Sequence, residues 1–376
     1  MENILNRIEK VNGILNGFIW GPYMLVFFLL VGGMFTIRTG FFQITQIRQW
    51  MEVTLLSVFK DRRVLKTDDR HSISQFQSLC TALAATIGTG NIAGVATAIA
   101  LGGPGAVFWM WLSAFLGMMT NYAENTLGIK YRYRNEKGDW IGGAMIYIER
   151  GLHCRWLAVI FSVFCFLASF GIGNMTQANS IAGGLESSFG VPAWVTAIAV
   201  MIFVALVIVG GIKRIASVTE KVVPFMAVFY IAGGLVVIGR NLGAVPQAFA
   251  LIFREAFHFQ AAGSGVLGYG IATAMKRGIS RGVFSNEAGL GSSVMVHSAS
   301  DVEEPVIQGM WGVFEVFADT IVVCTITCLT ILTSGVYDMD AYLTAIAAGG
   351  EDAVVSGAAL TANAFATVIP HGDKFV

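Results

Sequence analysis

Charged residues along this chain leave long gaps, and each gap is long enough for a helix that crosses a membrane. Such a helix needs about 20 mostly apolar residues, so the gaps locate candidate spans. The first gap, from Lys10 to Arg38, is longer than a signal peptide and lacks a small-residue cleavage site. Seven further spans are predicted at residues 72–101, 105–123, 156–189, 192–214, 221–240, 262–299 and 304–338.

Three segments complicate this order of eight spans. Residues 246–259 have an amphipathic pattern that is typical of a helix lying at the membrane interface. The seventh span is rich in glycine and is interrupted by Lys276, Arg277 and Arg281. Residues 335–376 are moderately polar, and we interpret them as an external segment that leads toward a further span.

Basic residues concentrate in alternate connections between the spans. The connections after spans one, three and five carry Lys and Arg, whereas the turns after spans two and four carry almost none. By the positive-inside rule the basic connections are cytoplasmic, which predicts that the N-terminus and Val376 lie outside the cytoplasm. Leu101–Gly105 is then a short external turn, and Lys130–Lys137 a cytoplasmic loop.

The composition agrees with a chain that faces lipid and argues against several soluble classes. Of the 376 residues, 55% are apolar and 13% are charged, whereas a soluble domain has about 25% charged residues. No basic patch with interleaved aromatic residues indicates a nucleic acid as partner. No phosphate loop or histidine pair at metal-binding spacing occurs, and the scattered cysteines predict buried thiols rather than disulfides or a zinc site.

The second span contains Gly88-Thr89-Gly90 near its middle, where a helix unwinds most easily. Unwound backbone at membrane depth survives only where it lines a cavity or binds a ligand. Its N–H groups suit a carboxylate, and its carbonyls suit a cation. The alternative is that these small residues allow close helix packing.

A second interruption, Gly289-Leu290-Gly291, follows Ser285, Asn286 and Glu287 in the seventh span. Its nearby cations also fit a cytoplasmic loop. The two interruptions begin two successive sets of spans, at span two and at span seven. Interrupted segments at corresponding positions of two halves are the best sequence indication of a transporter site.

A long sequence motif now points to a known family. The stretch GGPGAVFWMWLSAFLG at residues 102–117 matches the signature of the alanine or glycine:cation symporter family at every position. TALAATIGTGNIAGVATAIA before it, and RGVFSNEAGLGS and GVFEVFADTIVVCTITC after it, resemble other stretches of that family. The chain resembles this family from the first span onward.

The resemblance implies an all-α polytopic fold similar to that of the neurotransmitter:sodium symporters. That fold has one leading helix, followed by ten core helices in two inverted repeats of five. Residues 1–71 then form the leading helix and a basic loop, residues 72–240 the first repeat, and residues 241–376 the interfacial helix and an incomplete second repeat. We expect the last three core helices, which help to form the substrate and cation sites, to be missing from this chain.

The resemblance also implies roles for individual residues. GTGN at residues 88–91 resembles the GxGN motif of the wider fold, in which backbone groups hold the amino acid carboxylate and the asparagine oxygen faces the cation. The implied cation ligands are Asn91 and the carbonyls of Ala84 and Ile87. The implied substrate-binding residues, among which Phe284 limits the size of the substrate side chain, are Gly88, Thr89, Gly90, Asn91, Gln177, Phe284, Ser285 and Asn286. Asn174 and Gln177 fit equally well as structural amides that bond to a neighbouring helix.

Glu124 lies at the end of the third predicted span, and Glu315 and Asp319 lie within the eighth. An ionisable residue inside a membrane is a functional candidate by default. For Glu124 we favour an ion pair with Lys130 or Arg132 at the helix end. Glu315 and Asp319 share one helix face, and we expect them to pair with the cations of the seventh span as a gate. The aromatic residues of the family signature are expected to pack or to lie at the lipid boundary: Phe108, Trp109 and Trp111.

The resemblance therefore implies sodium-coupled symport of a small neutral amino acid, such as alanine or glycine, across the plasma membrane of a prokaryote. Alternating access would involve no covalent chemistry and no cofactor, and the coupling ion would be sodium or a proton. The rival interpretations are a proton-coupled carrier of the same fold, a non-transporting receptor or scaffold, and a membrane-embedded enzyme. An enzyme needs a catalytic constellation at depth, and the histidines lie outside the predicted spans or at their ends: His71, His153, His258, His297 and His371.

Overall fold

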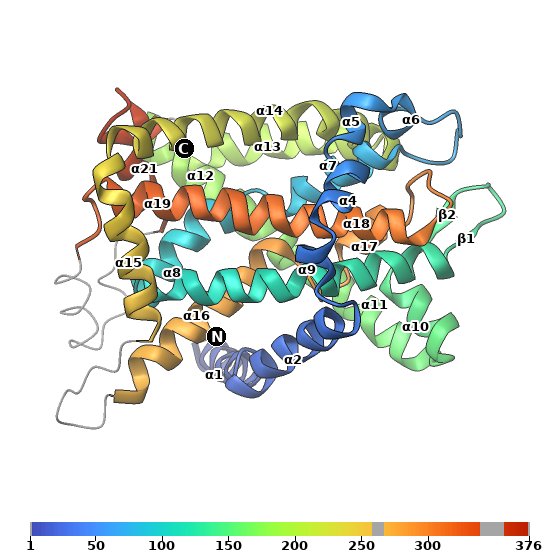
Figure 1. The fold of residues 1–376 in the computed structure, drawn as a ribbon, viewed down its shortest axis with the longest axis horizontal. Helices are drawn as coiled ribbons and strands as arrows, with labels where there is room; N and C mark the ends of the chain where they lie inside the picture. The colour runs from blue at the N-terminus through green and yellow to red at the C-terminus, as the bar shows by residue number, and fades with distance from the viewer. Residues whose placement is uncertain (1, 258–266, 339–356, 375–376) are drawn as a thin grey trace.

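The computed structural model describes residues 2–257, 267–338 and 357–374, and these residues are mainly helical (Figure 1). The N-terminal part forms α1 (Glu2–Ile19), α2 (Pro22–Arg38), α3 (Phe42–Thr45), α4 (Ile47–Val53), α5 (Ser57–Lys60) and α6 (Arg62–Leu65). It is followed by α7 (Gln75–Thr86), the π-helical η1 (Gly90–Gly94), α8 (Val95–Gly102), α9 (Gly105–Tyr131), β1 (Tyr133–Arg134), β2 (Trp140–Ile141) and α10 (Ala144–Leu152). The strands β1 and β2 pair antiparallel.

The second half of the chain is also helical. It begins with α11 (Arg155–Phe170), the π-helical η2 (Gly171–Met175), α12 (Thr176–Phe189), α13 (Ala193–Ile208) and α14 (Gly211–Arg240). The remaining elements are η3 (Leu242–Ala244), α15 (Val245–Ala256), α16 (Leu267–Asn286), α17 (Ser293–His297), α18 (Pro305–Val316), the π-helical η4 (Phe317–Cys324), α19 (Thr325–Thr333), α21 (Gly357–Ala366) and η6 (Gly372–Lys374).

Four helices among the described residues are long and apolar enough to cross a membrane, or five if one bent pair counts as a single span. The bent pair is Gln75–Thr86 with Gly90–Gly102, whose axes differ by 48°. These five coincide with the predicted spans one, two, four, six and eight. The other three predicted spans contain the helices α9, α13 and α16, and their crossing of the membrane stays a prediction.

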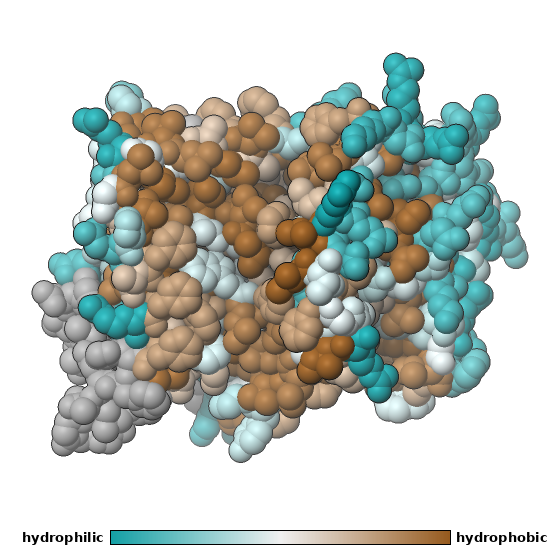
Figure 2. All heavy atoms as spheres, viewed as in Figure 1, coloured by the Kyte–Doolittle hydropathy of each residue, from teal (hydrophilic) through white to brown (hydrophobic). Residues whose placement is uncertain are grey.

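The surface separates an apolar middle from a polar end. Figure 2 shows hydrophobic side chains over the middle of the visible face, with polar residues gathered at the end that carries α6, β1 and β2. Large apolar side chains are exposed along α2, α11, α13 and α14. Contiguous exposed apolar surface on this scale suits lipid better than water.

Close packing of α16 against α9 holds the centre of the bundle together. A side chain at Gly278 would place its Cβ 2.1 Å from the carbonyl oxygen of Ala106, and one at Gly282 would lie 2.3 Å from Ser113 Oγ. Small residues one turn apart let two helix backbones approach in this way. Residues 267–286 of the seventh span therefore form a packed helix, so a loop is wrong for residues 281–286 of the interrupted stretch.

The amphipathic segment and the aromatic signature pack against each other. The helix α15 buries Ala248, Ile252 and Ala256 on one face. Trp109 donates from Nε1 to the carbonyl of Ala256 at 3.3 Å. The rings of Phe108 and Trp109 also contact Phe257, and Trp111 contacts Phe249 and Phe253. The signature aromatics thus pack, as the sequence predicted.

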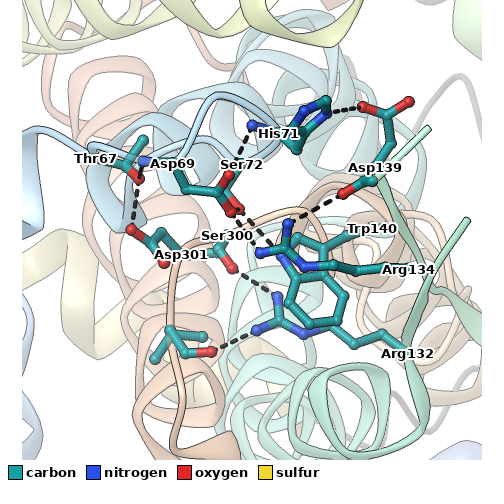
Figure 3. Close-up of polar contacts among 12 residues, drawn as sticks. Thr67, Asp69, His71, Ser72, Arg132, Arg134, Asp139, Trp140, Ser300 and Asp301 are labelled. Carbon is teal, nitrogen blue, oxygen red and sulfur yellow. Dashed lines mark hydrogen bonds and ion pairs between the residues drawn. The ribbon is translucent and has the colours of Figure 1, made fainter. Parts of the chain in front are cut away.

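Residues that are distant in sequence meet at the polar end (Figure 3). The guanidinium groups of Arg132 and Arg134 lie 3.9 and 4.5 Å from the ring centroid of Trp140. Arg132 also donates to backbone carbonyls of the α17–α18 connection, namely those of Ser298 at 2.8 Å, Ser300 at 2.6 Å and Val302. This connection is thereby fixed to the end of α9.

The same end carries two contacts between charged side chains. Arg134 pairs with Asp69 at 2.6 Å, and His71 Nδ1 lies 3.0 Å from the carboxylate of Asp139 (Figure 3). Hydrogen bonds from Ser72 and from the His71 backbone, together with Arg134, hold the pKa of the Asp69 carboxyl well below its usual range. The carboxylate is therefore ionised throughout the physiological range, and the segment before α7 is tied to the β1–β2 hairpin.

Candidate functional site

The first break in the bundle lies at residues 87–89, between α7 and η1. The helix α7 begins with a capping box in which Ser74 and Gln77 satisfy each other's backbone amides. It ends at Thr86, and the backbone of the next residue, Ile87, is extended. The amide of Gly88 then donates to Asn91 Oδ1 at 2.9 Å, which leaves the carbonyl of Ala84 without its usual helical donor.

Asn91 connects this break to the eighth span. Its Nδ2 donates to Asp319 Oδ1 at 2.7 Å and to the Asp319 carbonyl at 3.1 Å. The other carboxylate oxygen accepts from Ser285 Oγ at 2.8 Å and from Thr320 Oγ1 at 2.7 Å. Each of these four residues is at most 1% exposed. We refer to Asn91, Ser285, Asp319 and Thr320 as the central cluster.

The residues of the central cluster come from three separate elements. Asn91 lies in η1, Ser285 in the last turn of α16, and Asp319 in η4. Gly90 permits this approach, because a Cβ there would lie only 3.3 Å from the Cα of Ser285. Two of the three elements are π-helical, and such turns occur frequently at functional sites.

The second break lies at residues 287–292, between α16 and α17. Glu287, Gly289 and Gly291 all have positive φ, so the chain cannot continue as a helix there. The amide of Gly289 donates to Glu124 Oε2 of α9 at 3.0 Å. The prediction that Glu124 pairs with Lys130 or Arg132 is therefore wrong, because its carboxylate binds the freed backbone of the second break.

Several predicted substrate residues lie around the first break. Thr89 donates from Oγ1 to Gln177 Oε1 at 2.9 Å, and that oxygen lies 3.6 Å from where a Cβ of Gly88 would be. Asn174 instead bonds locally to the carbonyl of Ser169 and is exposed. Gln177 therefore faces the break, and Asn174 does not.

The remaining predicted residues are arranged differently. Asn286 is buried and donates to Thr320 Oγ1 at 3.1 Å, beside the central cluster. Phe284 is half-buried, and its ring faces the guanidinium group of Arg281 at 5.8 Å. Ala84 is exposed, and the side chain of Ile87 is buried. Their roles as ligands stay predictions.

Glu315 and Asp319 do not have the partners that the predicted gate requires. Asp319 takes its donors from the central cluster, and Glu315 takes them from Asn121, Ser293 and His297. These polar groups replace the cations of α16 that we expected as partners. Sequence reasoning thus named Asp319, as an acid inside a predicted span, but expected a gate and missed its position among Asn91, Ser285 and Thr320.

Two broken helices that meet at a buried polar cluster inside an apolar helical bundle are typical of a membrane transporter. The sequence matches the sodium:alanine symporter family over residues 5–376, and the chain belongs to that family. It is 47% identical to the sodium/alanine symporter AgcS of Methanococcus maripaludis, over 99% of this chain and 78% of that relative.

Two relatives from Bacillus subtilis are more distant. One is the putative sodium/proton-dependent alanine carrier protein YrbD, 37% identical over 96% of this chain and 72% of its own length. The other is the probable sodium/glutamine symporter GlnT, 38% identical over 90% of this chain and 67% of its own length. Family membership makes this chain a multi-pass membrane protein of cation-coupled amino acid symport, and the family is one of transporters rather than enzymes.

Proposed function

We propose that this chain carries out sodium-coupled symport of a small neutral amino acid, such as alanine or glycine, across the plasma membrane. The observation that carries the proposal is the central cluster, where an amide beside the first break, a hydroxyl group beside the second break, and a carboxylate and a hydroxyl group from η4 converge. Oxygen ligands of this kind, together with carbonyls freed by unwound helices, suit a hard monovalent cation. The relatives whose names include sodium support the same coupling ion.

We place the sodium ion next to Asp319, with Asn91 and Ser285 as the neighbouring polar groups. Both of these side chains donate to the Asp319 carboxylate in the present arrangement. A cation at this position needs their oxygens instead, so the Asn91 amide and the Ser285 hydroxyl must rotate. The carbonyls of Ala84 and Ile87 at the end of α7 would complete the ligand set.

We place the carboxylate of the amino acid at Thr89 and Gly90, where the N-terminus of η1 begins. Backbone N–H groups at the start of a half-helix favour a negative group. The side chain of Gln177 is hydrogen-bonded to Thr89 at this position. This contact leaves little room beside the first break and therefore favours a substrate with a small side chain. Rocking of the bundle around the two breaks would then expose the site to each side in turn.

The decisive experiment is counterflow of labelled alanine in proteoliposomes containing the full-length protein, with and without sodium. We expect exchange that requires sodium. Asp319→Asn keeps the size of the side chain but removes its charge. It should lower the apparent affinity for sodium about ten- to a hundred-fold, because a buried hydrogen bond to a charged group contributes about 1.5–3 kcal/mol.

The matched control is Asp68→Asn, because Asp68 is exposed on the connection before α7. It should leave the sodium dependence unchanged. Exchange that proceeds without sodium but follows a pH gradient would favour the proton-coupled alternative. Binding of alanine with no exchange at all would favour a receptor.

A further inference from the structure

Cations and a large apolar side chain are exposed side by side on α5 and α6, between the first and second spans. The ring of Phe59 in α5 is 81% exposed. Four cations follow it directly, and all four are exposed: Lys60, Arg62, Arg63 and Lys66. We refer to these four residues as the basic patch. Because neither the ring nor the cations pack into the core, this surface is available for a contact outside the chain.

Apolar packing fixes the basic patch to the side of the bundle. Val64, next to Arg63, is buried in one apolar cluster with Leu79 of α7 and Val223 of α14. The helix α14 is long and apolar enough to cross a membrane, and its Phe225, two residues beyond Val223, is exposed. The basic patch therefore lies beside a spanning helix, where the apolar middle of the surface meets the polar end (Figures 1 and 2).

Other cations at this end of the molecule have anionic partners within the chain. Arg134 pairs with Asp69 at 2.6 Å, and Arg48 pairs with Glu52 at 2.9 Å. In the part of the chain that the structure describes, no carboxylate forms such a pair with any cation of the basic patch. These four charges thus do not serve to join one segment of the protein to another.

One acid lies among the four cations. Asp61 is the N-cap of α6, and its carboxylate accepts from the backbone amide of Arg63 at 2.9 Å. The segment therefore keeps a net positive charge. Like charges held close together repel one another, and an anionic partner relieves that repulsion.

The exposed ring distinguishes between two kinds of anionic partner. A soluble anion would neutralise the cations but would leave Phe59 in water. At a membrane surface, the cations lie at the level of the headgroups and an aromatic ring lies at the boundary with the acyl chains. Clusters of Lys and Arg directly after a spanning helix are also typical of segments that bind anionic lipids. The combination of charge and exposed ring therefore favours a lipid surface.

We propose that the basic patch binds the phosphate groups of anionic phospholipids in the leaflet at the polar end, with Phe59 at the edge of the acyl chains. The long apolar stems of lysine and arginine let the charged ends reach the headgroups while the backbone stays packed on α7 and α14. The bound lipid anchors α6, and through Val64 it supports the start of α7. This inference does not depend on the substrate or the coupling ion proposed above.

The test is thermal unfolding of the purified full-length protein in a neutral detergent, with increasing amounts of phosphatidylglycerol or of phosphatidylcholine with the same acyl chains. A ligand that binds only the folded state raises the melting temperature, by an amount set by its concentration relative to its Kd. We expect phosphatidylglycerol to raise it more than phosphatidylcholine does. The difference should shrink between about 0.1 M and 1 M salt, because the range of charge interactions falls from about 10 Å to about 3 Å.

Arg62→Gln/Arg63→Gln removes two charges of the basic patch and keeps the buried Val64. Each cation near an anionic membrane surface contributes about fivefold in affinity. The double variant should therefore need about twenty-five-fold more phosphatidylglycerol for the same rise in melting temperature. Its response to phosphatidylcholine should not change.

The matched control is Arg70→Gln/Lys137→Gln, which removes the same charge from two exposed residues at the same end. Within residues 67–151, all of which the structure describes, no large apolar side chain is exposed. These two cations therefore face water rather than lipid. The control should respond to phosphatidylglycerol as the unaltered protein does.

Lys60→Gln/Lys66→Gln is the second variant, for use if the first does not fold, and it should show the same loss. Glycerol phosphate, which is a soluble headgroup without acyl chains, should not raise the melting temperature. The inference is overturned if the unaltered protein responds equally to the two lipids, or if glycerol phosphate alone reproduces the rise. It is also overturned if a folded double variant of the basic patch keeps the response of the unaltered protein.

Discussion

Asn91 joins the first break to η4, because its amide oxygen accepts from the Gly88 amide and its amide nitrogen donates to Asp319. Replacing it with alanine removes a buried donor from a carboxylate and releases the backbone of the break. We expect Asn91→Ala to weaken alanine or sodium binding about ten- to a hundred-fold, because a buried partner of a charged group contributes about 1.5–3 kcal/mol. Equilibrium binding of labelled alanine to the purified protein, titrated with sodium, measures the change.

The control for this substitution is Asn12→Ala, because Asn12 is exposed on α1. It should bind alanine and sodium as the unaltered protein does. Normal binding by Asn91→Ala, together with misfolding of Gly90→Val, would show that the residues of the break serve helix packing alone.

At the scale of the residue, sequence reasoning identified the residues of the helix breaks, which a local motif marks. It did not identify the contacts that form only when helices pack together. The GTGN stretch could be assigned to a break because glycine and its neighbours act locally. Asp319 lies in a stretch that resembles the family and His297 lies outside such stretches, but the partners of both come from other helices. Which of the acids faces which helix depends on the rotation of each helix in the bundle, and neither hydropathy nor charge spacing reports that rotation.

At the scale of the element, the packing of α16 against α9 positions the central cluster, because Ser285 reaches this cluster from the end of α16. A Cβ at Gly278 would lie 2.1 Å from a backbone oxygen, which cannot move aside as a flexible side chain can. We expect Gly278→Ala to destabilise the protein by about 1–3 kcal/mol, the usual cost of overpacking. Thermal unfolding in detergent measures this as a lower melting temperature.

Gly239 in the last turn of α14 supplies the control, because a Cβ there meets no atom within 4 Å. Gly239→Ala should stabilise the helix slightly, since alanine is favoured over glycine in helices by up to about 1 kcal/mol. Equal melting temperatures for the two variants would mean that α16 and α9 do not pack as described.

Most helices were predictable from the spacing of charged residues. Gaps in the charge pattern located the spans because lipid tolerates few charges at any rotation of a helix. Residues 267–286 were harder, since Lys276, Arg277 and Arg281 resemble the charges of a loop. Their helix follows from the glycine face that packs on α9, and this feature becomes visible only when both helices are placed together.

At the scale of the whole molecule, the ends of the bundle differ in chemistry. The end with β1 and β2 holds the arginine, aspartate and histidine contacts of Figure 3, and the opposite end holds the corner between α14 and α15 (Figure 1). The turn Leu101–Gly105 and the β1–β2 hairpin lie at opposite ends of α9, whose 27 residues extend about 40 Å. This separation is what the predicted external turn and cytoplasmic loop require.

The positive-inside rule then assigns the polar end to the cytoplasm, and two positions test it. Lys137 is exposed in the β1–β2 turn, and Leu242 is 65% exposed after α14. We expect a membrane-impermeant maleimide to label Leu242→Cys in right-side-out vesicles and Lys137→Cys in inverted vesicles. The background for both variants lacks Cys154 and Cys165, the half-buried native thiols, and keeps the buried Cys80, Cys324 and Cys328.

The background protein without either new cysteine is the control and should remain unlabelled in both kinds of vesicle. Labelling of Lys137→Cys from outside and of Leu242→Cys from inside would reverse the orientation. The start of α7 lies at the same end of the bundle as the β1–β2 hairpin, because Asp69 and Arg134 join the two segments. A reversed orientation would therefore place the start of α7, together with the contacts of Figure 3, on the external side of the membrane.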